Sequence, residues 1–190
     1  MRILSIALLA TLVSVALAQG DAEKGSHIPS QAAADVVREY AGTDGAFLAA
    51  GLVRSGFQRD DLASLLQYPT DELVVVTITG TQVKQAFERS LSLYPQSNSS
   101  FLQISGFEVV FAKDAPIGQR VVQVRCNNQP LEESKDYQIA MPSLLGRGGL
   151  GYFKIWDKAK ITKTFQNVTV ESVLKAKKVV DSAPRWVASS

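Results

Sequence analysis

Hydrophobic and polar residues follow two different periods along the chain, one typical of strands and one of helices. Residues 72–79 (ELVVVTIT) are rich in β-branched side chains and stop at Gly80, which predicts a buried strand. From Thr81 the period becomes that of a helix ended by Pro95, with one apolar stripe formed by Val83, Phe87, Leu91 and Tyr94. The chain is therefore expected to pass from a strand into an amphipathic helix at Gly80.

The same patterns predict further elements on both sides of this pair. Helices are expected at residues 30–40, with Ser30 as the N-cap, at 60–66 and from about Thr169. Apolar or alternating runs predict strands at 45–54, 101–111, 120–126 and 137–141. We expect 101–111 and 120–126 to form a hairpin, and these two strands to join 72–79 and 137–141 in one mixed sheet under the helix at 81–93. The predicted fold class is α+β, a mixed β-sheet flanked by helices.

The N-terminus reads as a cleavable signal peptide. A charged start is followed by an apolar run and by the small-x-small sequence ending at Ala18, after which cleavage is expected. The run is shorter than the roughly 20 apolar residues that cross a bilayer, so no membrane span is expected after cleavage. The predicted organisation is a signal peptide at 1–18, a flexible linker at 19–29, one domain at 30–182 and a tail at 183–190. The protein is accordingly expected to be secreted or periplasmic.

Composition excludes several kinds of chemistry. Basic and acidic residues nearly cancel, 20 against 18, and no basic stripe appears, so nucleic acid is not an expected partner. The only histidine is His27, in the expected linker, and the only cysteine is Cys126, inside an alternating strand where a buried thiol is expected. These two residues cannot form a metal cluster or a nucleophile–histidine pair, so no catalytic residue, metal or cofactor is predicted. Asn98 and Asn167 lie in glycosylation sequons, which have meaning only in a eukaryotic source.

Several stretches, taken in order and spacing, resemble the C-terminal domain of 5'-nucleotidases. They are LVVVTITGTQVKQAFERSL (73–91), SSFLQISGFEVVF (99–111), IGQRVVQVRCNNQPLEESKDYQIAMP (117–142) and LLGRGGLGY (144–152). With the weaker AAGLVRSGF (49–57), the resemblance runs from about residue 31 to 153. Each stretch alone is weakly specific, but the ordered set is strong.

The resemblance implies a ligand pocket. In that family an N-terminal metallophosphoesterase domain performs hydrolysis, and the C-terminal domain stacks the nucleotide base between two aromatic rings. The resemblance places one ring at Phe101, for which a role in the core is an equally good interpretation. It also matches Arg54 to the arginine that ends the family's Asn-Gly-Gly-x-Ile-Arg motif. Leu144 stands where the second ring is expected, and Leu150 replaces the aspartate of the glycine turn. The family has a further turn just before the strand at 72–79. Residues 68–71 differ from it, so they cannot be matched to the family's positions one by one.

Two functions remain open at this stage. The first is a nucleoside- or nucleotide-binding module that is not catalytic alone and complements a separate metallophosphoesterase chain. Loss of one stacking face and of the aspartate predicts weak binding of adenosine or AMP. The alternative is an extracellular or envelope interaction module, a scaffold that kept the fold and lost the nucleotide site.

Overall fold

The computed structural model describes residues 21–189, so the predicted signal peptide lies outside the described residues. The helices are α1 (Ile28–Ala41), α2 (Gly80–Ser90), α3 (Ser143–Gly146) and α4 (Val170–Leu174), and short 3₁₀ helices are η1 (Ala50–Leu52), η2 (Leu62–Leu65), η3 (Gly149–Lys154) and η4 (Lys158–Lys160). The strands are β1 (Gly45–Ala49), β2 (Glu72–Thr79), β3 (Leu102–Ser105), β4 (Phe107–Ala112), β5 (Val121–Cys126), β6 (Gln129–Pro130), β7 (Asp136–Pro142), β8 (Ile161–Thr169) and β9 (Trp186–Ser189). The α+β class is confirmed.

The strands form two sheets rather than the single sheet expected. One has the order β3-β1-β7-β2-β8, with β1 and β7 parallel, and the other has the order β6-β5-β4-β9, with β4 and β9 parallel. The predicted strand 101–111 is divided between the sheets at Gly106, whose φ of +78° only glycine adopts easily. A side chain at this position would also overlap the Asp44 carbonyl oxygen. The predicted hairpin is confirmed as β4 and β5.

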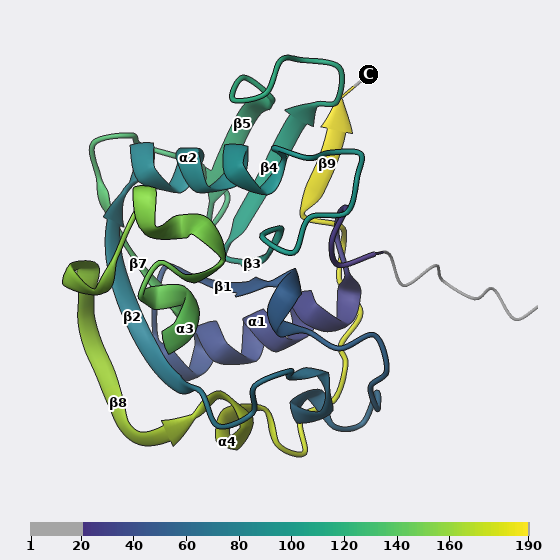
Figure 1. Ribbon diagram of the computed structural model, residues 1–190, viewed down its shortest axis with the longest axis vertical. Coiled ribbons are helices and arrows are strands. Elements are labelled where there is room, and N and C mark those ends of the chain that lie inside the picture. The colour runs from purple at the N-terminus through teal and green to yellow at the C-terminus, as the bar shows by residue number, and fades with distance from the viewer. Residues whose placement is uncertain (1–20, 190) are drawn as a thin grey trace, which may run out of the picture.

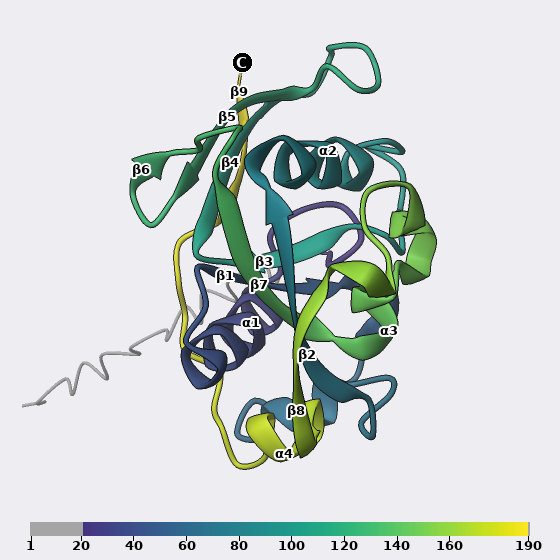
Figure 2. The ribbon, with the colours of Figure 1, turned by 90° about the vertical axis from the view of Figure 1, so that its left-hand side faces the viewer.

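Helix α2 lies between the two sheets and contacts both β2 and β5 (Figure 1). Its apolar stripe faces inward, since Val83, Phe87 and Leu91 are fully buried as the pattern predicts. Phe87 meets Phe47 and Phe107 at 5.7 Å and 5.6 Å between ring centroids. Helix α1 packs on the other side of the five-stranded sheet, against β1, β3 and β7 (Figure 2). The core therefore joins both sheets and both long helices.

The first residues of the helices, and the residues that cap them, differ from the prediction. Helix α1 begins at Ile28, because Pro29 fits the first turn of a helix and His27 takes the N-cap position assigned to Ser30. Helix α2 begins with a capping box in which the Thr79 side chain accepts a hydrogen bond from the Gln82 backbone N–H. The helix expected at 60–66 is the single 3₁₀ turn η2, with Asp61 as its cap.

Both terminal segments are packed rather than loose, which corrects two expectations. Residues from Asp21 onward, placed in a flexible linker, are held by the Gln103 side chain, which donates hydrogen bonds to the carbonyls of Ala22 and Gly25. His27 is buried, and its Nδ1 lies 2.7 Å from Ser30 Oγ.

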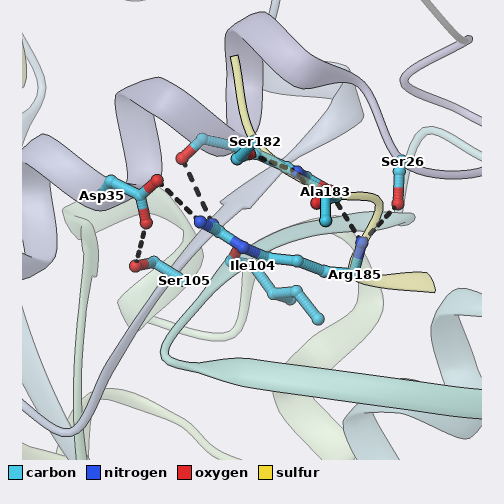
Figure 3. Close-up of polar contacts among 8 residues, drawn as sticks. Ser26, Asp35, Ile104, Ser105, Ser182, Ala183 and Arg185 are labelled. Atoms are coloured by element: carbon cyan, nitrogen blue, oxygen red, sulfur yellow. Dashed lines mark hydrogen bonds and ion pairs between the residues drawn. The ribbon is translucent and has the colours of Figure 1, made fainter. Parts of the chain in front are cut away.

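The expected tail at 183–190 instead supplies β9 and an anchor formed by Arg185. This guanidinium pairs with Asp35 at 2.6 Å, and Asp35 also accepts a hydrogen bond from Ser105 (Figure 3). The next residue, Trp186, is buried and donates its indole N–H to the Leu102 carbonyl at 2.9 Å.

Candidate functional site

The glycine-rich turn that runs from the end of α3 into η3 contains Leu150, which lies inside η3. This residue has φ 55° and ψ 26°, a left-handed conformation that costs a non-glycine residue about 1–2 kcal/mol. Its carbonyl accepts hydrogen bonds from Arg89 at 2.6 Å and from Ser100 Oγ at 2.8 Å. Arg89 also lies over the ring of Tyr152. The strained backbone at Leu150 is thus held by one side chain of α2 and one from the segment before β3.

Two more segments meet this turn. Val53 and Leu66 form an antiparallel bridge, and the Gln67 N–H donates to the Leu52 carbonyl at 2.9 Å. The Gly51 N–H donates to the Ser99 carbonyl at 2.8 Å, and a side-chain carbon at this glycine would lie 3.4 Å from the Leu150 side chain. Gly51 therefore lies between Ser99 and the Leu150 side chain.

The turn at 68–71 is tied to the start of α3 by Asp71. The Leu144 N–H donates to Asp71 Oδ2 at 3.0 Å, and the Asp71 N–H donates to the Tyr68 carbonyl. Burial raises the pKa of Asp71 above its usual value, although the hydrogen bond from Leu144 and the charge of nearby Arg147 act in the opposite direction. A carboxyl with a raised pKa at the edge of a surface site is a common feature of functional sites.

The structure brings together two of the residues singled out from the sequence, Leu144 and Leu150, at the glycine-rich turn. Leu144 is 38% exposed, Leu150 is half-buried in the same turn, and Arg54 is exposed at the end of the bridged segment. Phe101 is only 1% exposed, and its ring packs on Trp186 at 4.7 Å between centroids. Phe101 therefore has no free face for a base in this structure, which corrects its expected stacking role in favour of the core interpretation.

Tyr68 is the aromatic residue that the sequence interpretation missed. It is 51% exposed, and Asp71 ties its turn to Leu144. The signal was present in the turn at 68–71, whose register the sequence alone did not fix. We name the surface formed by Tyr68, Leu144 and Leu150 the Tyr68 face.

A cavity of about 440 Å³ opens beside Arg54. It is lined by Asp21, Ala22, Glu23, His27, Ala50, Val53, Arg54 and Ser55. Burial lowers the pKa of His27, and the charge of Asp21 only partly offsets this effect. The N-terminal segment thus forms one wall of the space that the Arg54 side chain can reach.

Residues 21–189 contain no group of three or more His, Cys, Asp and Glu side chains arranged to hold a metal ion. Within the same span, no helix has the length and apolar character needed to cross a membrane. Cys126 is buried, and this burial raises the pKa of its thiol to about 11.

A family model described as "5'-nucleotidase, C-terminal domain" matches residues 11–157, which is most of the chain. The chain belongs to this family. The mouse 5'-nucleotidase is 38% identical to this 5'-nucleotidase C-terminal domain over 92 residues, which cover 44% of the chain and 16% of the mouse protein. The snake venom 5'-nucleotidase of Naja atra is 36% identical over 89 residues, covering 43% of the chain and 17% of that protein. The chain therefore spans less than a fifth of the length of these relatives.

The fold of this 5'-nucleotidase C-terminal domain is similar to part of a solved bacterial structure. The crystal structure of the 5'-nucleotidase precursor from Thermus thermophilus matches with a TM-score of 0.72 and 21% identity, over 90% of this chain and 37% of that one. The likeness confirms the fold predicted from the ordered stretches.

Proposed function

We propose that this exported 5'-nucleotidase C-terminal domain binds a nucleoside or nucleotide at the Tyr68 face and does not hydrolyse it alone. One observation supports the proposal, namely that the Asp71–Leu144 hydrogen bond ties the 68–71 turn to the start of α3, while Gly51 lies beside the Leu150 side chain of the glycine turn. These segments include the residues by which the chain resembles the family pocket. Tyr68 supplies the exposed aromatic ring of the face that they form.

The chemistry of the face suits an aromatic base. Stacking of a base on an aromatic ring contributes roughly 1–3 kcal/mol. Leu144 and Leu150 offer apolar surface but no hydrogen-bond partner for the base or sugar, because the aspartate expected in the glycine turn is absent. Arg147 is an exposed cation whose charge acts on Asp71, and Arg54 is a second exposed cation; either would suit a phosphate group. We therefore expect Kd values in the high-micromolar to millimolar range, roughly −6 to −4 kcal/mol.

Hydrolysis is proposed to come from a separate metallophosphoesterase chain. The single histidine of the sequence lies at the start of α1 with its Nδ1 beside Ser30 Oγ, and among residues 21–189 no group of three or more His, Cys, Asp and Glu side chains is arranged to hold a metal ion. The relatives are much longer than the chain, which leaves room in them for another domain. In this scheme the chain supplies the surface that holds the base, and the partner supplies the reacting groups.

Ligand-observed NMR with AMP and adenosine tests the binding site. We expect Tyr68→Ala to lose most of the binding and Tyr68→Phe to keep it, because the ring rather than the hydroxyl stacks on the base. Leu93→Ala is the control, since Leu93 is exposed but lies outside the face. Equal binding by the wild type and Tyr68→Ala would place the site elsewhere.

A second measurement tests the partnership. A metallophosphoesterase of the same organism that lacks a C-terminal domain is assayed with AMP, with and without this protein. We expect the wild type to lower KM and Tyr68→Ala to lower it less. An unchanged KM with every such enzyme contradicts the partnership while leaving the binding result intact.

The scaffold alternative rests on a separate observation. Phe153 is 63% exposed and lies next to Gly148, so the glycine turn carries an apolar residue that no nucleotide contact requires. If neither AMP nor adenosine binds the wild type, this interpretation replaces the first.

A further inference from the structure

A second polar pocket lies at the junction of the two sheets. It has a volume of about 320 Å³ and is lined by Arg38, Gly106, Phe107, Glu108, Asn127, Asn128 and Arg185. Asn127 and Asn128 form the turn before β6, and Figure 2 shows β6 and α3 on opposite sides of the molecule. The pocket is therefore separate from the Tyr68 face.

Arg38 is the group in this pocket that lacks a protein partner. It lies in the last turn of α1 and is half-buried, yet among residues 21–189 its guanidinium forms none of the ion pairs and donates no side-chain hydrogen bond. Guanidinium groups taken partly out of water are normally paired with an acceptor. Arg38 thus presents unused donors and a positive charge to the pocket.

The remaining lining residues fix what the pocket can accept. The guanidinium of Arg185 is already engaged by Asp35, so its charge is largely compensated (Figure 3). Asn127 donates a long hydrogen bond of 3.3 Å to the Asp44 carbonyl, whereas Asn128 donates no side-chain hydrogen bond to a described residue. Asn128 has φ 66°, is exposed and belongs to the lining of the pocket. Arg38 and Asn128 together offer donors suited to an oxyanion.

Gly106 allows the guanidinium to approach the backbone. A side-chain carbon at this position would lie 3.1 Å from Arg38 Nη1 and would overlap the Asp44 carbonyl oxygen. The same glycine divides the long strand into β3 and β4, so the bend between the sheets also creates the space that Arg38 occupies.

Charge in the pocket limits the ligand to a small anion of low charge. Glu108 belongs to the lining and lies opposite Arg125 in the neighbouring strand, and the Asp44 backbone carbonyl oxygen lies beside Arg38 at the Gly106 bend. The Glu108 carboxylate opposes the entry of a polyanion more strongly than that of a monoanion. We propose that Arg38 and Asn128 form a binding site for a small oxyanion with a single charge, a carboxylate or a monovalent phosphate.

Backbone and side-chain NMR titrations with acetate, phosphate and pyrophosphate, at about pH 6.5 and constant ionic strength, test this site. We expect acetate or phosphate to shift the side-chain signals of Arg38 and Asn128 with saturation, and pyrophosphate to shift them less. Saturation by acetate but not phosphate assigns a carboxylate site, and the reverse assigns a phosphate site. If no anion gives saturable shifts at these residues, the proposal is wrong.

Variants separate a specific site from general attraction. Arg38→Ala should weaken binding roughly tenfold to a hundredfold, the usual effect of losing a charged hydrogen bond. Lys113→Ala removes the same charge from an exposed position outside the pocket and should leave binding unchanged. An equal loss in both variants would reduce the effect to net charge.

Glu108→Gln tests the proposal by a gain in anion affinity rather than a loss. Removing the opposing carboxylate should tighten the binding of phosphate and raise that of pyrophosphate most. A variant that folds, as judged by its far-UV circular dichroism, and binds neither anion more tightly contradicts the proposed selection by charge.

Discussion

At the scale of single residues, His27 links the fold to pH. Its burial lowers its pKa below the unfolded value of about 6.5, so the unfolded chain takes up a proton that the folded protein resists. The stabilisation from neutral His27 is complete above this unfolded pKa and is lost as the pH falls below it. We expect the free energy of unfolding to fall by up to about 1.4 kcal/mol per pH unit between the two pKa values. Urea denaturation at a series of pH values measures the slope.

His27→Gln is the control for this slope, because glutamine can keep a hydrogen bond to Ser30 without titrating. We expect this variant to be less sensitive to acid across the same window. A slope equal to that of the wild type would assign the acid sensitivity to other groups.

Two glycines with similar backbone angles give a second residue-scale prediction. Gly151 has φ +80° and Gly42 has φ +65°, so alanine at either position should cost about 1–2 kcal/mol in strain. At Gly151 the added carbon would also lie 2.1 Å from Arg89 Nη2, which is held by the Leu150 carbonyl, whereas the space around Gly42 is open. Thermal unfolding should show Gly151→Ala to be less stable than Gly42→Ala by a further 1–3 kcal/mol or so. Equal losses of stability in the two variants would mean that the Arg89 side chain moves aside at little cost.

At the scale of elements, the C-terminal strand β9 closes the core. Trp186 is buried against Phe87 and Phe101, with ring centroids at 5.4 Å and 4.7 Å. A chain ending at Pro184 loses this side chain together with the Arg185 anchor and should be destabilised by about 3–5 kcal/mol or more in urea denaturation. A chain ending at Ala188 keeps Trp186 and should stay within about 1 kcal/mol of the full-length protein. Similar losses for both chains would show that the last residues, not the indole, are decisive.

The sequence predicted best those features that depend on residues close together along the chain. Strand β2 and helix α2 were predicted closely because their periods and the change at Gly80 lie within one stretch of chain. The division into two sheets was missed, since it depends on the bend at Gly106 and on the pairing of β4 with β9, which are far apart in sequence. Contacts between distant parts of the chain also explain why the sequence pointed to Phe101 rather than Tyr68 as the aromatic residue of the site. A strand-entry phenylalanine and an aromatic residue in a turn look alike until Trp186, from the other end of the chain, covers the first.

At the scale of the whole molecule, the shared core predicts that both sheets unfold together. Trp156 packs beside Phe47 of the five-stranded sheet, and Trp186 belongs to the four-stranded one. These are the only two tryptophans, so Trp156→Phe and Trp186→Phe each leave one reporter. In each variant, tryptophan fluorescence and far-UV circular dichroism should give the same urea midpoint. Separate midpoints would show that the sheets are independent units.

Strand β8 has a consequence for how copies of the protein meet at high concentration. Among the strands of residues 21–189 it pairs with β2 alone and forms one end of its sheet, so its outer row of backbone groups is a template for another strand. Lys163, two register shifts in the pairing with β2 and the left-handed backbone of Asn167 interrupt that row. Lysines and irregular pairing at an open sheet end disfavour fibrous aggregation. Neutral substitutions at Lys163 should therefore lower colloidal solubility before they lower the melting temperature.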